Sequence, residues 1–420
     1  MSDPGGRGAT GGGEHTLAAR VAPGTPPAAI PPTVRGLALV SLFNDFASEM
    51  VYPLLPAFVV GTLGGGPGTL AALDGAADLA AAATKWYSGG LADRPGWRKP
   101  LILLGYASAV LMRPLIAGAS AAWQVVGFRV LDRIGKGLRT PARDAMIADV
   151  TPAAIRGRAF GFHRAADHFG SIPGALIAWW LVSHAMPVRT VLTWSVLPGL
   201  VAALILVVVL RAAPGDHAAR TAEPPSRGAV DHAARAAESD ATGRTFWAPV
   251  LALAFLVLLR LPETLLLLRL QDLGVAVATI PLVWAGLHVV RTLSSYPGGW
   301  LVDHLGPRWT VAAGGLAFGL AAAGLGAARS PAVAIAVFLA LGLVAGLTES
   351  AERALIARLA PRRTGRGFGA YHAVTGLAAL PAALGFGALY QAGGGGMALW
   401  ASAGGMLVAT LCWLAAAKES

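Results

Sequence analysis

Two stretches of the chain share one pattern, GGLADRPGWRKP at residues 89–100 and GGWLVDHLGPRW at residues 298–309. Asp93 in the first stretch and Asp303 in the second lie 210 positions apart. Two more pairs of stretches repeat at nearly the same spacing: RGRAFGFHR (156–164) with GRGFGAYH (365–372), and RDAMIA (143–148) with ERALIA (352–357). Three pairs at nearly one offset predict a chain built from two halves of the same fold.

The composition indicates that both halves lie in a membrane. Of the 420 residues, 55% are hydrophobic and only 13% are charged, and the mean hydropathy is +0.60. Soluble domains carry about 25% charged residues, so this chain has too little charge to coat soluble domains. Twelve membrane-crossing helices of about 20 residues need about 240 residues, which the apolar content supplies. The sequence therefore predicts an all-α, polytopic membrane protein.

Hydropathy and helix-breaking residues predict six spans in each half. A segment at 212–245, rich in Ala, Pro, Asp, Glu and Arg, has no apolar run and predicts a solvated linker. Residues 1–35 are rich in Gly, Pro and Ala, lack the apolar core of a signal peptide, and predict a disordered tail. The predicted bundles are thus 36–211 and 246–420. The predicted spans are 36–62, 69–90, 100–119, 121–148, 159–184 and 190–211, then 246–269, 275–298, 309–328, 331–358, 367–391 and 396–417.

The net charge of +11 would suggest a nucleic-acid partner in a soluble protein, but here it follows from the loops. Loops on one side carry most of the loop Arg and Lys, whereas only Arg189 and Arg329 fall on the other side. Loops rich in Arg and Lys usually stay on the cytoplasmic side of a membrane. We therefore expect a protein of the bacterial inner membrane with both termini and the linker in the cytoplasm. The single Cys412 excludes a disulfide framework and a cysteine-based zinc site. The basic loop residues are Arg94, Arg98, Lys99, Arg156, Arg158, Arg308, Arg358, Arg362, Arg363 and Arg366.

Three strings resemble signatures of the major facilitator superfamily. Residues 89–100 resemble its G-x-L-A-D-R-x-G-R-K motif between spans two and three, with Trp97 in place of a basic residue. Residues 129–137 resemble its fourth-span R-x-x-Q-G-x-G motif, with Arg133 where glycine is common. A fifth-span pattern associated with exporters survives in part at 170–174. The strings FNDFASEMVYPLLP and DRIGKGLRTPARDAMIAD look like a bacterial subgroup.

This resemblance covers residues 36–417 and implies two pseudo-symmetric six-helix bundles. It also implies that the aspartate of the first motif, Asp93, braces an outward-open state through neighbouring helix ends. The expected cytoplasmic gate residues are Gly89, Asp93, Arg94, Gly96, Arg98, Lys99, Asp303 and Arg308.

Several ionisable residues fall inside the predicted spans, where a charge costs at least about 2.5–3.5 kcal/mol. Asp45 and Glu49 share one helix face at depths of roughly 13 and 20 Å. Arg129, Arg133 and Lys136 form a stripe along the fourth span. Each set could tie helices together or face a substrate and proton cavity, and the sequence leaves both possibilities open. The full candidate set is Asp45, Glu49, Arg129, Asp132, Arg133, Lys136, Arg260, Glu263, Glu349 and Glu352.

The leading functional prediction is a secondary active transporter of a small solute, coupled to protons, with a slight preference for efflux of an organic compound. Its expected partners are this solute, protons and membrane lipids, and the protein is expected to be monomeric without a cofactor. Motifs for zinc hydrolysis, phosphate cradling or a serine nucleophile are lacking in the sequence. Two alternatives remain at this point: a membrane enzyme of lipid or glycan metabolism, and a non-transporting sensor or assembly protein.

Overall fold

The computed structural model describes residues 29–55, 57–65, 67–213, 244–275, 279–360 and 363–417, and these residues contain helices and no β-strand. The predicted tail up to residue 28 and the linker residues 214–243 lie outside the described residues. The prediction of a tail up to residue 35 was too long, because the first helix already begins at Pro32. Proline is favoured in the first helical turn, where its missing N–H is no loss.

The first half runs from α1 to α7 and the second from α9 to α14. The helices of the first half are α1 (Pro32–Val51) with the short turns η1 (Tyr52–Leu54) and η2 (Ala57–Thr62), α2 (Pro67–Ala92), α3 (Arg98–Gly118), α4 (Ala122–Val150), η3 (Ala153–Ile155), α5 (Arg156–Ser183), α6 (Val188–Trp194) and α7 (Val196–Ala212). Those of the second are α9 (Arg244–Leu258), α10 (Glu263–Asp272), α11 (Ile280–Leu305), α12 (Pro307–Ala327), α13 (Pro331–Leu359) and α14 (Thr364–Ala416).

The helices follow the predicted spans, although the first span is interrupted after Val51 by η1 and η2, and the sixth is divided into α6 and α7. Three further differences lie in the second half. The predicted seventh span is two helices, α9 and α10, because Pro262 precedes the new start at Glu263. The predicted eighth span ended too early, since α11 continues to Leu305 and includes Asp303. The last two spans are joined within α14 at Gly394, whose φ of +76° suits a glycine turn.

Five segments of the described chain are long and apolar enough to cross a membrane by composition alone: Arg98–Gly118, Val188–Ala212, Pro307–Ala327, Pro331–Leu359 and Thr364–Ala416. The helices that fall short include α4, whose sequence holds the stripe of Arg and Lys. Large apolar side chains such as Leu204 and Leu320 are exposed, at 69% and 75%, which suits a surface that faces lipid.

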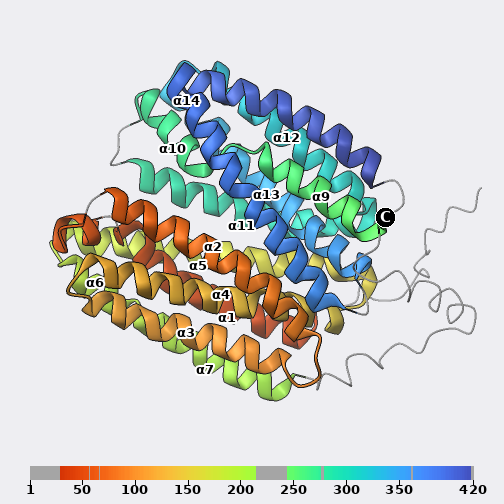
Figure 1. The fold of residues 1–420 in the computed structure, drawn as a ribbon, viewed down its shortest axis with the longest axis horizontal. Coiled ribbons are helices and arrows are strands. Elements are labelled where there is room, and N and C mark those ends of the chain that lie inside the picture. The colour runs from red at the N-terminus through yellow and green to blue at the C-terminus, as the bar shows by residue number, and fades with distance from the viewer. Residues whose placement is uncertain are drawn as a thin grey trace, which may run out of the picture.

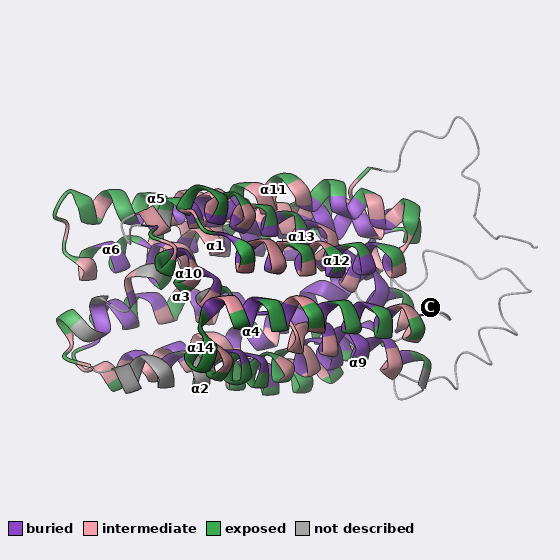
Figure 2. Cartoon of the chain, turned by 90° about the horizontal axis from the view of Figure 1, so that it is seen from above, coloured by how far each residue is buried: buried purple, intermediate pink, exposed green. Residues whose placement is uncertain are grey.

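The two halves lie side by side, with their helices running along the long axis of the molecule (Figure 1). The first described helix begins, and the last one ends, at the same end of the molecule (Figures 1 and 2). We call this end the terminal face. The α2–α3 turn, the end of α7 and the start of α9 also lie there.

Helix pairs from different halves approach closely near the terminal face. A Cβ on Gly89 of α2 would lie 2.6 Å from the carbonyl oxygen of Gly365 in α14. A Cβ on Gly299 of α11 would lie 2.2 Å from the carbonyl oxygen of Gly157 in α5. Such separations are closer than any real Cβ tolerates, so glycine at these positions lets the two backbones touch.

Candidate functional site

The carboxylate of Asp93 links the end of α2 to the start of α14 in the other half. It accepts hydrogen bonds from the backbone N–H groups of Gly365 and Arg366, both at 2.8 Å. These donors belong to the first turn of α14, which has no partner for them within the helix. A carboxylate also complements the positive end of the helix dipole. Asp93 therefore ties the two halves together at the terminal face.

Asp303 repeats this arrangement at the end of α11. Its carboxylate accepts hydrogen bonds from the backbone N–H of Gly157 at 2.8 Å and of Arg158 at 3.1 Å, in the first turn of α5. The Arg158 guanidinium adds an ion pair at 3.1 Å. The repeat seen in the sequence is thus two reciprocal contacts, each running from one half to the other.

The remaining motif residues support these helix ends. Lys99 donates to the carbonyl oxygens of Leu210 and Ala213 at the end of α7, at 2.8 and 2.7 Å. Arg308, which is 209 positions later in the sequence, donates to the Leu414 carbonyl at the end of α14. Each cation thus lies at a helix C-terminus, where the dipole favours positive charge.

Arg98 has a role that the second half does not repeat. It forms an ion pair with Asp149 at 2.6 Å, lies 4.0 Å from Asp93, and donates to Thr364 at 3.4 Å. The position 209 residues later holds Pro307. Gly96 and its counterpart Gly306 both have a left-handed φ, at +80° and +81°, which permits the tight turn after each aspartate.

An aromatic pair also joins the two halves, formed by residues that correspond in the sequence repeat. Phe160 of α5 and Phe368 of α14, which correspond in the two halves, pack against each other with ring centroids 5.9 Å apart. Both side chains are almost fully buried. Deeper in the molecule the two halves are joined by polar contacts instead.

One polar cluster joins α4 to the second half through Asp144. Its carboxylate lies 2.9 Å from Arg143, 2.9 Å from Nε2 of His372 and 3.6 Å from Arg353. Asp144 is almost completely buried. A buried carboxylate is tolerated because it is surrounded by cations and hydrogen-bond donors from three helices.

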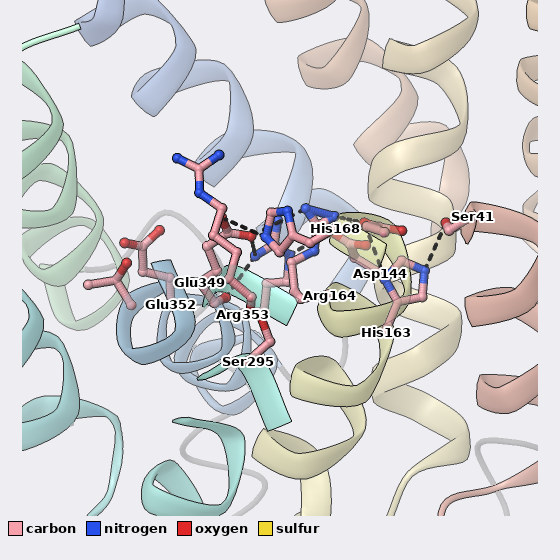
Figure 3. A network of polar contacts seen from close by, with 12 residues as sticks. Ser41, Asp144, His163, Arg164, His168, Ser295, Glu349, Glu352 and Arg353 are labelled. Atoms are coloured by element: carbon pink, nitrogen blue, oxygen red, sulfur yellow. Dashed lines mark hydrogen bonds and ion pairs between the residues drawn. The ribbon is translucent and has the colours of Figure 1, made fainter. Parts of the chain in front are cut away.

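A second cluster joins α5 to α13 through Glu349 (Figure 3). Its carboxylate lies 3.3 Å from Arg164, 3.6 Å from His168 and 3.7 Å from Arg353. Arg164 is also paired with Asp167, one turn further along α5. Together the Asp144 and Glu349 clusters form a buried polar layer between the halves.

A small charged pocket lies on the inner side of the first half, between α1 and α4. It has a volume of about 130 Å³. The six candidate residues that sequence reasoning placed in the first half all line it. The lining is Asp45, Ser48, Glu49, Tyr52, Arg129, Asp132, Arg133, Lys136 and Arg139.

Only part of the charge in this pocket is paired. Arg129 forms an ion pair with Asp132 at 3.2 Å and stacks over the Tyr52 ring. Arg139 donates to the Gly105 carbonyl and stacks on the Tyr106 ring. Asp45 accepts only a hydrogen bond from Asn44 among the contacts of the described residues. For Glu49, Arg133 and Lys136, the described residues provide no hydrogen bond or ion pair within 4 Å.

The four candidates of the second half are distributed differently. Arg260, Glu263 and Glu349 line a narrow cavity of about 70 Å³. Arg260 and Glu263 are three residues apart but do not pair with each other: Glu263 pairs with Arg291, and Arg260 stacks over Phe318. Glu352 lies apart from that cavity and accepts a hydrogen bond from Tyr371.

A larger cavity of about 570 Å³ lies at the terminal face beside Asp93. It is lined by aromatic and basic side chains, among them Trp86, Trp247, Arg94 and Arg366. Its lining shares no residue with the charged pocket or with the Asp144 and Glu349 clusters. The described residues contain no group of three or more His, Cys, Asp or Glu side chains that could hold a metal ion.

Sequence reasoning missed the residues whose role depends on the other half. Arg164, Asp167 and His372 did not enter the candidate set, yet they carry the contacts of the polar layer. Arg113 was also missed, although its guanidinium donates to Asn44 and Ser48 beside the charged pocket. For Arg164 and Asp167 the available signal was a pair of opposite charges one turn apart inside a predicted span.

Comparison with known proteins identifies the family. The sequence profile of the Major Facilitator Superfamily matches residues 37–270 and 261–420. The chain belongs to this superfamily. Members of the superfamily are transporters and not enzymes, which removes the membrane-enzyme alternative. The chain is therefore a multi-pass membrane protein with the superfamily fold.

Two curated relatives in the superfamily share part of the sequence. An uncharacterised transporter of the superfamily from Methanocaldococcus jannaschii is 34% identical over 143 residues, covering 34% of this chain and 35% of the relative. The multidrug resistance protein MdtH of Photorhabdus laumondii is 34% identical over 98 residues, covering 23% of this chain and 24% of that protein. The matched region thus spans between about a quarter and a third of these relatives.

Solved superfamily structures match nearly the whole chain. The human organic anion transporter MFSD10 superposes with a TM-score of 0.71 at 15% identity, covering 91% of this chain and all of that one. The proton:xylose symporter XylE superposes with a TM-score of 0.72 at 15% identity, covering 90% and 94%. These likenesses establish the two-bundle fold.

Proposed function

We propose that the chain is a proton-coupled secondary transporter that exports a small organic solute across the bacterial inner membrane, with both termini in the cytoplasm. The observation that carries the proposal is the charged pocket, where two carboxylates without ion-pair partners lie among cations in the middle of membrane-spanning helices. Ionisable groups at that depth are costly and are retained in transporters for proton and solute movement.

The terminal face carries the basic loops, which supports its assignment to the cytoplasm. The contacts of Asp93 and Asp303 hold the halves together at that face, so the state described here is closed to the cytoplasm. Alternating access then requires both helix-end contacts to break as one bundle rocks against the other.

Coupling is assigned to Asp45 and Glu49, with Glu49 the principal proton carrier. In this state Arg129 pairs with Asp132, and among the described residues no arginine forms an ion pair with Glu49. A carboxylate without a paired cation is free to bind a proton when the pocket is shielded from water. The proposed direction of transport, out of the cell, is supported by the MdtH relatives, which are named multidrug resistance proteins.

The test uses purified full-length protein in liposomes loaded with a pH-sensitive dye. Organic solutes that raise the thermal stability of the protein are added, and both solute movement and lumenal pH are followed. We expect Glu49→Gln to abolish solute-driven proton movement while solute exchange persists. Glu263→Gln is the matched control, because this second-half carboxylate is paired with Arg291.

Unaltered proton movement in both Asp45→Asn and Glu49→Gln would remove the first-half pocket from coupling. If none of the stabilising solutes crosses the membrane, the non-transporting alternative replaces the proposed function.

A further inference from the structure

The charged pocket presents opposite charges from two different helices. Asp45 and Glu49 belong to α1, and Arg133 and Lys136 belong to α4. Ser48 also lines this cavity and accepts a hydrogen bond from Arg113. All four charged side chains line the same cavity of about 130 Å³, yet no ion pair joins the acids to the bases.

This separation is specific to the first half. The carboxylates of the second half are each bound to a described partner: Glu263 to Arg291, Glu349 to Arg164 and Glu352 to Tyr371. Even within the pocket, Asp132 has Arg129. The two carboxylates of the charged pocket that lack an ion pair therefore differ from these second-half carboxylates.

Simple alternatives for the occupant leave charges uncompensated. A metal cation would lie beside Arg133 and Lys136, which line the same cavity. A ligand with only an anionic group would be drawn to these cations but would leave Asp45 and Glu49 to be neutralised by protons alone. A ligand with only an amine would satisfy the acids and leave the cations unpaired.

We propose that the transported solute is a small zwitterion, whose anionic group binds Arg133 and Lys136 and whose ammonium group binds Asp45 and Glu49. This inference rests on the proposed transport function and names its substrate class. Arg133 offers a planar fork of donors that fits a carboxylate, while Lys136 acts as a point charge. The small volume favours a compact solute of few heavy atoms.

The same geometry explains how solute and proton would exchange. A bound ammonium group and a proton compete for the carboxylates of Asp45 and Glu49, since either one neutralises them. When the ammonium group arrives, the displaced proton leaves to the water on the side to which the pocket is open. Arg133 stays charged throughout and, together with Lys136, holds the anionic group.

The experiment measures binding with three matched series of probes on detergent-purified full-length protein. The first series is the straight-chain ω-amino acids from glycine to 6-aminohexanoate. The other two are carboxylates and primary amines with the same carbon chains. We expect one or two of the amino acids to raise the melting temperature at concentrations at least tenfold lower than the corresponding carboxylate or amine.

Variants then test the two subsites separately. Glu49→Gln should lose the preference for the amino acid over the matched carboxylate, and Arg133→Gln should lose the preference over the matched amine. Arg133→Lys should restore part of the latter preference. Arg329→Gln, in an exposed loop between α12 and α13, is the control and should keep both preferences.

A carboxylate or an amine that binds the unaltered protein as tightly as the matched amino acid would overturn the inference. So would variants that weaken all three series equally, because that result indicates a structural role. Binding is measured without transport, so the two proposals can fail separately. Transport of a singly charged solute would overturn the substrate class alone, whereas binding without movement of any solute would overturn the transport function alone.

Discussion

Among single residues, Asp93 and Asp303 make the most sharply testable contacts. Hydrogen bonds to charged groups contribute about 1.5–3 kcal/mol, so losing a carboxylate should weaken closure of the terminal face by about tenfold or more. We expect Asp93→Asn to slow transport with normal membrane insertion. Asp303 also binds two backbone N–H groups and Arg158, so we expect a comparable loss in Asp303→Asn.

Closure can be measured directly with a single cysteine at Phe160, introduced after Cys412 is changed to serine. Phe160 is buried between the halves, so thiol labelling should be slow in the parent and faster in both asparagine variants. Asp272→Asn is the control, because Asp272 contacts Tyr390 within the second half. Unchanged labelling in Asp93→Asn and Asp303→Asn would show that neither carboxylate holds the halves together.

Residue patterns predicted the charged pocket better than the polar layer. The four-residue spacing of Asp45 and Glu49 places them on one face of a helix. The spacing of Arg129, Arg133 and Lys136 likewise forms one stripe along a helix. Periodicity alone therefore predicted which residues line each side of the charged pocket. Periodicity assigns a residue to a face but does not say which distant helix that face meets. The contact of Arg164 with Glu349 spans 185 positions, and its partner could not be chosen from the sequence.

At the level of helices, the α2–α14 contact depends on glycine. Gly89 and Gly90 are neighbours, but only a Cβ on Gly89 meets backbone, whereas a Cβ on Gly90 has nothing within 4 Å. Overpacking of a tight contact typically costs about 1–3 kcal/mol. We expect Gly89→Ala to speed labelling of the cysteine at position 160, and Gly90→Ala to leave it unchanged. Equal labelling in both variants would contradict the close packing.

Helix limits were predicted well where prolines and charged loops mark them, as at the start of α13, and poorly where a helix continues past a polar residue. α11 includes Asp303, His304 and Leu305 because the polar side chains lie at its last turn, beyond the apolar run used for prediction. The break between α9 and α10 was missed because the stretch is uniformly apolar on both sides of Pro262.

The linker yields a further prediction at this level. Residues 212–245 have no apolar anchor in the sequence, and the described halves are held together by α2 with α14 and α5 with α11. Mild proteolysis should cut within this segment and leave two fragments that co-purify in detergent. Fragments that separate after the cut would show that the linker itself holds the bundles together.

Across the whole molecule, closure at one end is built from corresponding parts of the two halves. Gly89 with Gly365 and Gly299 with Gly157 are symmetry-related contacts, and Phe160 meets its own counterpart, Phe368. The charges depart from this symmetry, since Asp45 and Glu49 of the first half lack ion-pair partners, whereas Glu263 and Glu349 of the second half have them. The scaffold is thus shared between the halves, while the proposed chemistry belongs to the first half.

The stacked indoles of Trp86 and Trp247 give the molecule an optical reporter of its own movement. Their ring centroids are 6.3 Å apart, and the two rings come from different halves, on α2 and α9. Rocking of the bundles would separate the two rings. Because neighbouring indoles quench each other's fluorescence, this separation would change the fluorescence of the pair. The difference between the unaltered protein and Trp86→Phe isolates this pair from the other tryptophans. That difference spectrum should change on addition of a transported solute, so opening could be timed by stopped-flow fluorescence without any attached dye.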